Sequence, residues 1–246
     1  MRIFIYDSTF EGLLSAIYDA YYSKDKPDRI YDIQNYETNL IDELITIETD
    51  MTKFEKVYNA IENKISRESL QKIYHVYLTE MKESANLIYS YIRMGFKLGK
   101  EVDLHKNSDI VINMDKISEK VFYEKHRFMG FVRFKEINNI LYSSITPDFN
   151  ILPILASHFK NRLTNEYFII HDIKRDIALI YDRNEYYISK LSQKQKEVLM
   201  NSSDVGMYED LWKEYFKSTN IAERENPRLQ KRQMPAKYWD NMVELK

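Results

Sequence analysis

Three histidines and two aspartates stand where catalytic groups often lie, at the ends of expected strands and helices. His126 precedes an expected strand, His158 lies in an expected helix, and His171 and Asp172 end a further strand. Asp148 lies in the connection TPDFN. If these ends converge, imidazole and carboxylate groups could carry general acid–base chemistry, orient a water or bind a metal. The alternative is that each histidine is a structural hydrogen-bonding group.

Several classes of site are excluded or disfavoured by what the sequence lacks. The histidine spacing matches no HExxH or related metal signature, so no metal site is expected. The chain has 5 glycines and no GxxxxGK[ST], GxGxxG or GxSxG pattern. Cys is 0, which excludes disulfides, thiolate zinc sites, cysteine nucleophiles and cysteine ligands of an iron–sulfur cluster in this chain. We expect no cofactor.

Charge is separated along the chain although the total is close to neutral. The 36 basic and 38 acidic residues give a net charge of −2. Residues 1–50 carry 4 Lys/Arg against 11 Asp/Glu, whereas residues 125–175 carry 8 against 4 and residues 224–237 carry 5 against 1. This pattern favours a protein with one anion-facing surface. Chance clustering is the alternative.

The C-terminal run 224–239 mixes basic residues, amides and aromatics, a composition typical of phosphate contact combined with stacking on bases. Tyr238 or Trp239 would stack. Alternatively, the run is a solvated tail that these two aromatics anchor. The residues expected to contact phosphate in the two basic stretches are Arg127, Arg175, Arg228, Lys231 and Arg232.

Residues 127–134 (RFMGFVRF) match part of an RNA-binding strand signature, K/R-G-F/Y-G/A-F-V-x-F/Y. Phe128 and Met129 depart from it, and the aromatics would fall on both faces of a strand. We therefore predict a buried strand here, with Arg127 and Arg133 at its polar positions.

Periodicity and capping residues predict the elements that position these groups. Capping patterns stand at Ser8/Glu11, Thr52/Glu55, Ser66 and Ser108/Asp109. The expected strands are 2–6, 44–47, 127–134, 139–145, 167–172, 176–182 and 185–189. The expected helices begin near 8, 52, 66, 87, 109 and 150, with another at about 208–217, an irregular basic stretch after it, and a short helix after Pro235.

Helices first, then a mostly antiparallel sheet of about five strands, then helices again indicate an α+β fold. We predict a single domain over residues 1–246, with a soft subdivision near 100 between a mainly helical part and a sheet-containing part. No apolar run approaches the roughly 18 residues of a membrane span. The start, MRIFIYD, does not read as a signal peptide, so a cytoplasmic protein with no membrane partner is expected.

Five stretches resemble a bacterial family of DNA metabolism proteins defined by the domain of unknown function 4130. They are YDSTFEGLLSAIYDAY (6–21), HRFMGFVRF (126–134), ILYSSITPDFNILPILASHF (140–159), IIHD (169–172) and the tail from LWKEYF to AKYW (211–239). The resemblance runs nearly end to end, and the tail is its most specific part. In some bacteria this domain is fused to a uracil-DNA-glycosylase-like domain, which we do not expect within residues 1–246.

The resemblance implies a role in DNA modification or repair beside a radical-SAM protein, whose gene is usually adjacent in that family. Because this chain has no cysteine, the iron–sulfur cluster of such a pair would belong to the partner. We therefore expect an accessory protein that binds DNA. Two alternatives stay open: an enzyme acting on DNA or nucleotides through the His/Asp residues, or a protein-interaction module that docks through acidic residues such as Asp28 and Asp32.

Overall fold

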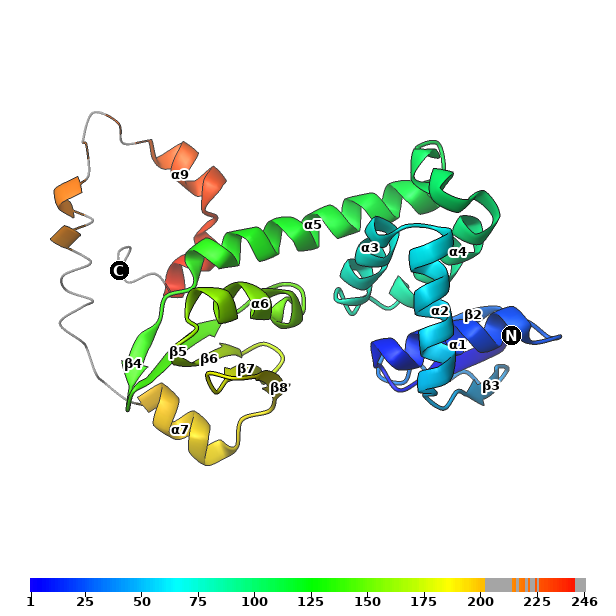
Figure 1. Ribbon diagram of the computed structural model, residues 1–246, viewed down its shortest axis with the longest axis horizontal. Coiled ribbons are helices and arrows are strands. Elements are labelled where there is room, and N and C mark those ends of the chain that lie inside the picture. The colour runs from blue at the N-terminus through cyan, green and yellow to red at the C-terminus, as the bar shows by residue number, and fades with distance from the viewer. Residues whose placement is uncertain (202–213, 216, 220, 222–223, 225, 242–246) are drawn as a thin grey trace. The chain divides into compact units, whose positions relative to one another are not determined.

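The computed structural model describes residues 1–201, 214–215, 217–219, 221, 224 and 226–241. The chain divides into two compact units, Met1–Phe122 and Tyr123–Lys246, and the long helix α5 (Asp109–Phe131) runs through the boundary between them. Each unit has its own sheet (Figure 1). The expected α+β class is confirmed. The two units divide after residue 122, whereas the soft subdivision was expected near residue 100.

Unit 1 (Met1–Phe122) contains a three-stranded parallel sheet. Strand β1 (Arg2–Tyr6) lies between β2 (Arg29–Asp32) and β3 (Glu43–Thr46). Residues 3–6 of β1 are buried, as is typical of a central parallel strand covered on both faces. The sequence predicted β1 correctly and β3 with a shift of one residue. It did not predict β2, whose four residues, RIYD, carry little periodicity.

The junction between β1 and α1 (Phe10–Tyr22) is filled by its own polar side chains. Thr9, not Ser8, caps the helix: its Oγ1 accepts from the Gly12 N–H at 2.9 Å, while Ser8 has a φ of 65°. Asp7 accepts from the hydroxyls of Thr9 and Thr49 at 2.6 and 2.8 Å. A Cβ at position 12 would lie 2.1 Å from Asp7 Oδ1, so this cluster requires glycine there.

A group of helices packs with this sheet in unit 1, and α1 and α4 contact its strands directly. Ser66 caps α3 as predicted, but Asp50 rather than Thr52 caps α2, since its carboxylate accepts from two amides of the first turn. Gly99 ends α4 with a φ of 61°, a conformation that glycine adopts at low cost. The elements are α2 (Met51–Lys64), α3 (Arg67–Tyr77), α4 (Ser84–Leu98), the 3₁₀ helix η1 (Gly99–Leu104) and the first part of α5.

Unit 2 (Tyr123–Lys246) contains a five-stranded sheet in the order β4-β5-β6-β7-β8. Strands β5 and β6 are parallel and the other pairs are antiparallel, so the sheet is mostly antiparallel, as expected. The turn between β4 and β5 lies at Asn138 and Asn139, whose φ values are 50° and 63°. The strands are β4 (Lys135–Ile137), β5 (Ile140–Ile145), β6 (Tyr167–Asp172), β7 (Ile177–Tyr181) and β8 (Tyr186–Ser189).

Two helices cover opposite faces of this sheet (Figure 1). Helix α6 (Leu152–Arg162) connects the parallel pair and places Phe159 beside Phe168 of β6, with ring centroids 6.4 Å apart. Helix α7 (Gln193–Asn201) contributes Leu199 to a buried cluster on the other face, with Tyr142 of β5. The sequence predicted the helix after β5, but Asn150 does not cap it; α6 begins at Leu152.

The strand predicted over residues 127–134 is wrong, because α5 continues to Phe131. The buried residues of this segment, Val121, Glu124 and Phe128, recur at helical spacing. The apolar residues that follow fit the helical period of 3.6 residues and the strand period of 2 equally well. Of the aromatic residues assigned to this strand, Phe128 and Phe131 instead lie on the last turns of α5, and Phe134 follows the helix. The partial RNA-binding strand signature therefore has no strand to carry it.

The tail is more regular than its composition indicated. Helix α9 (Pro227–Gln233) occupies the stretch expected to be irregular, capped by Asn226, whose side chain accepts from Leu229 N–H. The short helix after Pro235 is confirmed as the 3₁₀ helix η3 (Ala236–Asn241). Most of the helix expected at 208–217 lies outside the described residues. Across the described residues, every helix is too short or too polar to cross a bilayer.

Candidate functional site

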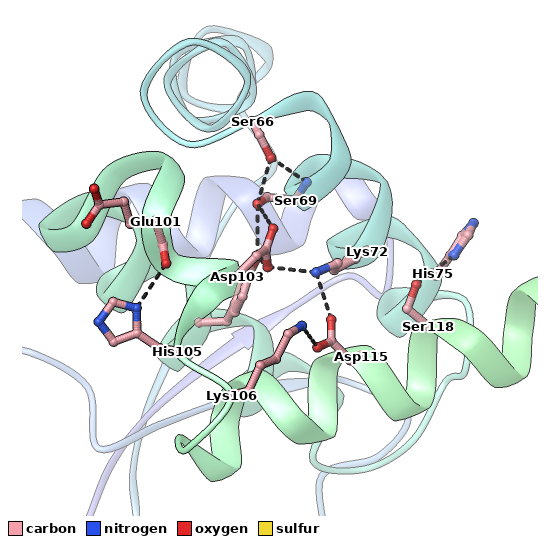
Figure 2. A network of polar contacts seen from close by, with 11 residues as sticks. Ser66, Ser69, Lys72, His75, Glu101, Asp103, His105, Lys106, Asp115 and Ser118 are labelled. Carbon is pink, nitrogen blue, oxygen red and sulfur yellow. Dashed lines mark hydrogen bonds and ion pairs between the residues drawn. The ribbon is translucent and has the colours of Figure 1, made fainter.

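The densest polar network of unit 1 centres on Lys72 of α3 (Figure 2). Its Nζ lies 2.7 Å from Asp103 Oδ1 of η1 and 2.7 Å from Asp115 Oδ1 of α5. Tyr91 of α4 and Ser69 of α3 donate hydroxyl protons to Asp103, at 2.6 and 3.2 Å. One lysine thus connects α3, η1 and α5, and Tyr91 ties α4 to the same carboxylate.

The electrostatics of this network hold its groups in their charged forms. Burial raises the pKa of Asp103, but hydrogen bonds from Lys72 and Tyr91 outweigh burial and bring the pKa below its ordinary value. Burial lowers the pKa of Lys72, and its bonds to Asp103 and Asp115 reverse this and raise it. A lysine held protonated is neither a nucleophile nor a base. The network therefore fixes the helices of unit 1 rather than forming a reaction centre.

Replacing Lys72 with methionine is expected to destabilise unit 1 by about 2 kcal/mol, because Asp103 loses its ion pair with Lys72 while Asp115 keeps only its pair with Lys106. This is below the roughly 3–5 kcal/mol of a fully buried pair, since about a fifth of the Lys72 side chain is exposed. Urea denaturation measures the change. The control is Lys97→Met on the exposed side of α4, expected within ~0.5 kcal/mol of wild type. Equal stability of the two variants would show that the network contributes little.

One of the candidate histidines, His171, belongs to a buried row of polar side chains next to α7. Its Nδ1 is 3.1 Å from the Tyr142 hydroxyl, and its Nε2 is 3.6 Å from Asp176 Oδ1. Lys196 of α7 pairs with the same Asp176 carboxylate at 2.6 Å. Burial lowers the pKa of His171 further than the nearby Asp176 carboxylate raises it, so the imidazole is neutral at pH 7.

Asp172 and Asp148 belong to a different arrangement. Asp172 is fully buried and accepts from the guanidinium of Arg175 at 2.9 Å and from the Lys174 amide at 3.0 Å. The same guanidinium donates to the backbone carbonyl of Asp148 at 2.8 Å. Glu124 of α5 accepts from the Asp148 amide at 3.0 Å. These contacts lock the β5–α6 connection onto the β6–β7 turn, and they occupy the guanidinium of Arg175.

The five acid–base candidates do not face one common pocket. His171 and Asp172 are neighbours in β6, so their side chains point to opposite faces of the sheet. His158 lies on α6, its ring 4.9 Å from that of Phe159 and on the face opposite α7. His126 is exposed on α5. The described residues also contain no group of three His, Asp or Glu arranged to hold a metal.

The lowered pKa of His171 predicts an acid-sensitive step in stability. An imidazole whose pKa lies below the ordinary 6.5 binds a proton more weakly when folded than when unfolded. The stability of unit 2 should therefore fall as the pH drops below about 6.5, until the folded pKa is passed. His171→Asn keeps a polar group opposite Tyr142 and does not titrate. Thermal unfolding between pH 7.5 and 5 should show a smaller decrease for this variant, and an identical decrease would contradict the assignment.

The C-terminal tail is anchored on the last turns of α5. Tyr238 of η3 is 4% exposed, and its ring packs on Phe128 and Phe131 with centroid distances of 5.1 and 5.3 Å. Its hydroxyl lies 3.5 Å from Glu124 Oε1. Trp239 is half-buried, and its indole N–H donates to the Met234 carbonyl at 2.9 Å. Tyr238 therefore serves as an anchor, which leaves it no exposed ring face for stacking on a base.

Helix α9 presents three cations on one face just before this anchor. Arg228, Lys231 and Arg232 are spaced at i, i+3 and i+4 and are exposed. Among the described residues, none of the three has an ion-pair or hydrogen-bond partner. Arg127, which lies one turn before the Phe131 contact, also has no carboxylate partner within the described part of the chain. These four residues are available to bind an anion.

A further positive region surrounds His158. Burial lowers its pKa, and the nearby charges of Arg162 on α6 and Lys125 on α5 lower it more. Two helices of unit 2 therefore contribute cations to one neighbourhood. His158, one of the candidate acid–base residues, is therefore a neutral imidazole near two positive charges.

The family model of a domain of unknown function, DUF4130, matches residues 82–244 of the chain. The chain belongs to the DUF4130 family. No curated protein matches the sequence. The DUF4130 region covers α4, α5, the five-stranded sheet and the tail, so it contains the cations of α9 and the α5 surface that anchors them. The resemblance noted for residues 6–21 lies outside the matched DUF4130 range.

Proposed function

We propose that this protein binds nucleic acid through the basic residues of unit 2 and serves as an accessory protein of DNA metabolism. The observation that carries the proposal is the face of α9, where three exposed cations without an ion-pair partner among the described residues lie on a tail anchored to α5 by Tyr238. We define the basic surface of unit 2 as these cations together with those of α5 and α6. Its members are Lys125, Arg127, Arg162, Arg228, Lys231 and Arg232.

Phosphate is the ligand class that suits these residues best. Three cations that repeat at i, i+3 and i+4 on an exposed helix have no partner within the described residues, and a phosphate backbone offers regularly spaced negative charges to such a face. Arg175 is not part of the proposed interface, because its guanidinium is bound to Asp172 and to the Asp148 carbonyl. Trp239 can offer only part of its ring to a ligand, since the side chain is half-buried and its indole N–H is donated to the Met234 carbonyl.

The two alternatives draw less support from the described residues. An acid–base site needs its groups within hydrogen-bonding reach of one substrate, and His171 lies across the sheet from His158. A docking surface built on acidic residues needs free carboxylates. Asp28 accepts from the Arg2 amide at 2.9 Å, and Asp32 accepts from the Asn35 side chain at 2.6 Å. Both carboxylates serve the local structure of unit 1.

We further propose that the protein acts with a radical-SAM enzyme that carries the iron–sulfur cluster. The support is the resemblance in sequence to the DNA metabolism family, together with the absence of cysteine from this chain. Co-expression of the two proteins followed by size-exclusion chromatography tests the association. A shared peak at micromolar concentration is expected, and separate elution at that concentration would remove this part of the proposal.

Titration of a fluorescently labelled DNA duplex with the intact chain at 50 mM salt tests the proposed binding. The expected result is saturable binding that excess unlabelled duplex competes away. A neutral peptide nucleic acid of the same sequence is the matched control, and we expect it to bind far more weakly because it has no phosphates. Absence of duplex binding at this low salt concentration would refute the proposal.

A further inference from the structure

Unit 1 contains a pocket of about 300 Å³ between α1, α2 and α4. This volume is at the lower end of the range of ligand pockets, roughly 300–1,000 Å³, and suits a small planar ligand better than a large one. The pocket walls are mainly aromatic and basic. The residues that define its chemistry are Tyr18, Tyr21 and Tyr22 of α1, Lys56 and Lys64 of α2, and Phe96 of α4.

The aromatic rings of the pocket form one connected cluster. Tyr22 packs against Tyr18 and Tyr21 with centroid distances of 4.6 and 5.4 Å, and Tyr21 meets Phe96 edge-on at 5.9 Å. Tyr21 is 50% exposed and Tyr22 is 69% exposed. Tyrosines in the core of unit 1, such as Tyr91, are fully buried by comparison. Two ring surfaces are therefore presented to a ligand at the end of α1.

The two lysines of the pocket have no acidic partner among the residues that the structure describes. Lys56 Nζ lies 5.5 Å from the centroid of the Tyr18 ring, and no carboxylate lines the pocket. Neither Lys56 nor Lys64 forms an ion pair within the described part of the chain. They are eight residues apart on α2 with Ala60 midway, which separates them by about 12 Å along the helix axis. A short phosphodiester chain has charges at a spacing that suits two lysines placed in this way.

The chemistry of the pocket selects among the possible ligands. An apolar helix or a second copy of a hydrophobic face would bury both lysines without a partner, which is costly. A cationic ligand would be repelled by the same lysines. A base stacked on tyrosine, with its phosphates near the lysines, satisfies both parts of the pocket, and aromatic platforms flanked by cations are typical of single-stranded nucleic-acid binding.

We propose that this pocket, the tyrosine–lysine pocket of unit 1, binds an unstacked base of single-stranded nucleic acid. The rings of Tyr21 and Tyr22 stack on the base, and Lys56 and Lys64 contact phosphates on either side of it. The proposal rests on the proposed function for its ligand class, nucleic acid, but uses no residue of the basic surface of unit 2. In this proposal, unit 1 binds single-stranded nucleic acid, and unit 2 contacts the phosphates of a duplex.

The test compares binding of a short oligothymidylate and of a duplex by the intact chain and by Tyr21→Ala/Tyr22→Ala. The variant is expected to bind the single strand roughly 5- to 150-fold more weakly and the duplex as wild type does. Tyr21→Phe/Tyr22→Phe keeps the rings and should bind as wild type. Tyr187→Ala, which removes a similarly exposed ring (53%) from β8, is the matched control.

A second readout is positional. Ultraviolet crosslinking of an oligonucleotide containing 5-iodouracil, followed by mass spectrometry, should place the modified base on Tyr21 or Tyr22. Unchanged single-strand affinity in the alanine variant, or crosslinks confined to unit 2, would overturn the tyrosine–lysine pocket while leaving the proposed function intact. If wild type binds neither single strand nor duplex at 50 mM salt, the proposed function fails as well.

Discussion

Replacing Arg228, Lys231 and Arg232 together with alanine is expected to weaken duplex binding by about 500-fold at 0.1 M salt. Each phosphate contact contributes a salt exponent of about −0.9, so each lost contact costs roughly eightfold at this salt concentration. The three side chains share one face of α9 and have no partner within the described residues, so each can engage a phosphate. Fluorescence anisotropy with a labelled duplex measures the loss.

The folded structure should tolerate these three changes because the side chains are exposed and make no contact that alanine would break. The matched control is Arg93→Ala/Lys97→Ala/Lys100→Ala. It removes the same number of exposed positive charges from the last turns of α4 and the start of η1 in unit 1. If both triple variants lose affinity equally, duplex binding follows net charge and the face of α9 is not the interface.

Tyr238→Ala is expected to detach the tail from α5 and to lower duplex affinity toward that of the α9 variant. Removing a buried aromatic ring costs about 3–5 kcal/mol, and the Tyr238 ring provides the packing on Phe128 and Phe131. The sheet of unit 2 should stay folded, since its own buried clusters are untouched. Limited proteolysis should then cut within residues 227–241 much faster than in wild type.

The conservative variant Tyr238→Phe separates packing from hydrogen bonding. It keeps the ring that packs on α5 and removes the hydroxyl, which lies 3.5 Å from Glu124 Oε1, so we expect near-normal proteolysis and DNA affinity. Tyr238→Ala with unchanged duplex affinity would mean that the cations of α9 act without being positioned by the tail anchor. In that case the basic residues would bind as a loose charged segment.

Local sequence signals predicted most of the elements because their causes are local. Short runs of apolar and aromatic residues identified strands β5 to β8 of unit 2 but missed β4, and Ser66 and Gly99 set helix boundaries as capping rules indicate. The segment after Phe128 was misread because its aromatics fit either period, and only the packing of Phe131 on Tyr238 decides for the helix. The start of helix α9 is marked in the sequence by Asn226 as the cap and Pro227 as the first helical residue. This signal was overlooked because the segment was interpreted from its basic composition.

The candidate sites were harder to predict because they depend on which face a side chain takes. His171 and Asp172 look like one polar pair in the sequence, yet adjacent strand residues point to opposite faces of a sheet. The neighbours of the Lys72 network come from four elements between residues 69 and 115, with no spacing that marks them. Likewise, the docking of Tyr238 onto a helix more than a hundred residues earlier has no local signature.

The salt dependence of duplex binding tests the central claim most directly. Affinity of the wild-type chain is measured between 50 and 300 mM salt and plotted as log K against log salt concentration. If Arg127, Arg228, Lys231 and Arg232 each contact a phosphate, the slope should be about −3.6 or steeper. A slope near zero, or no measurable binding at the lowest salt concentration, would contradict the account.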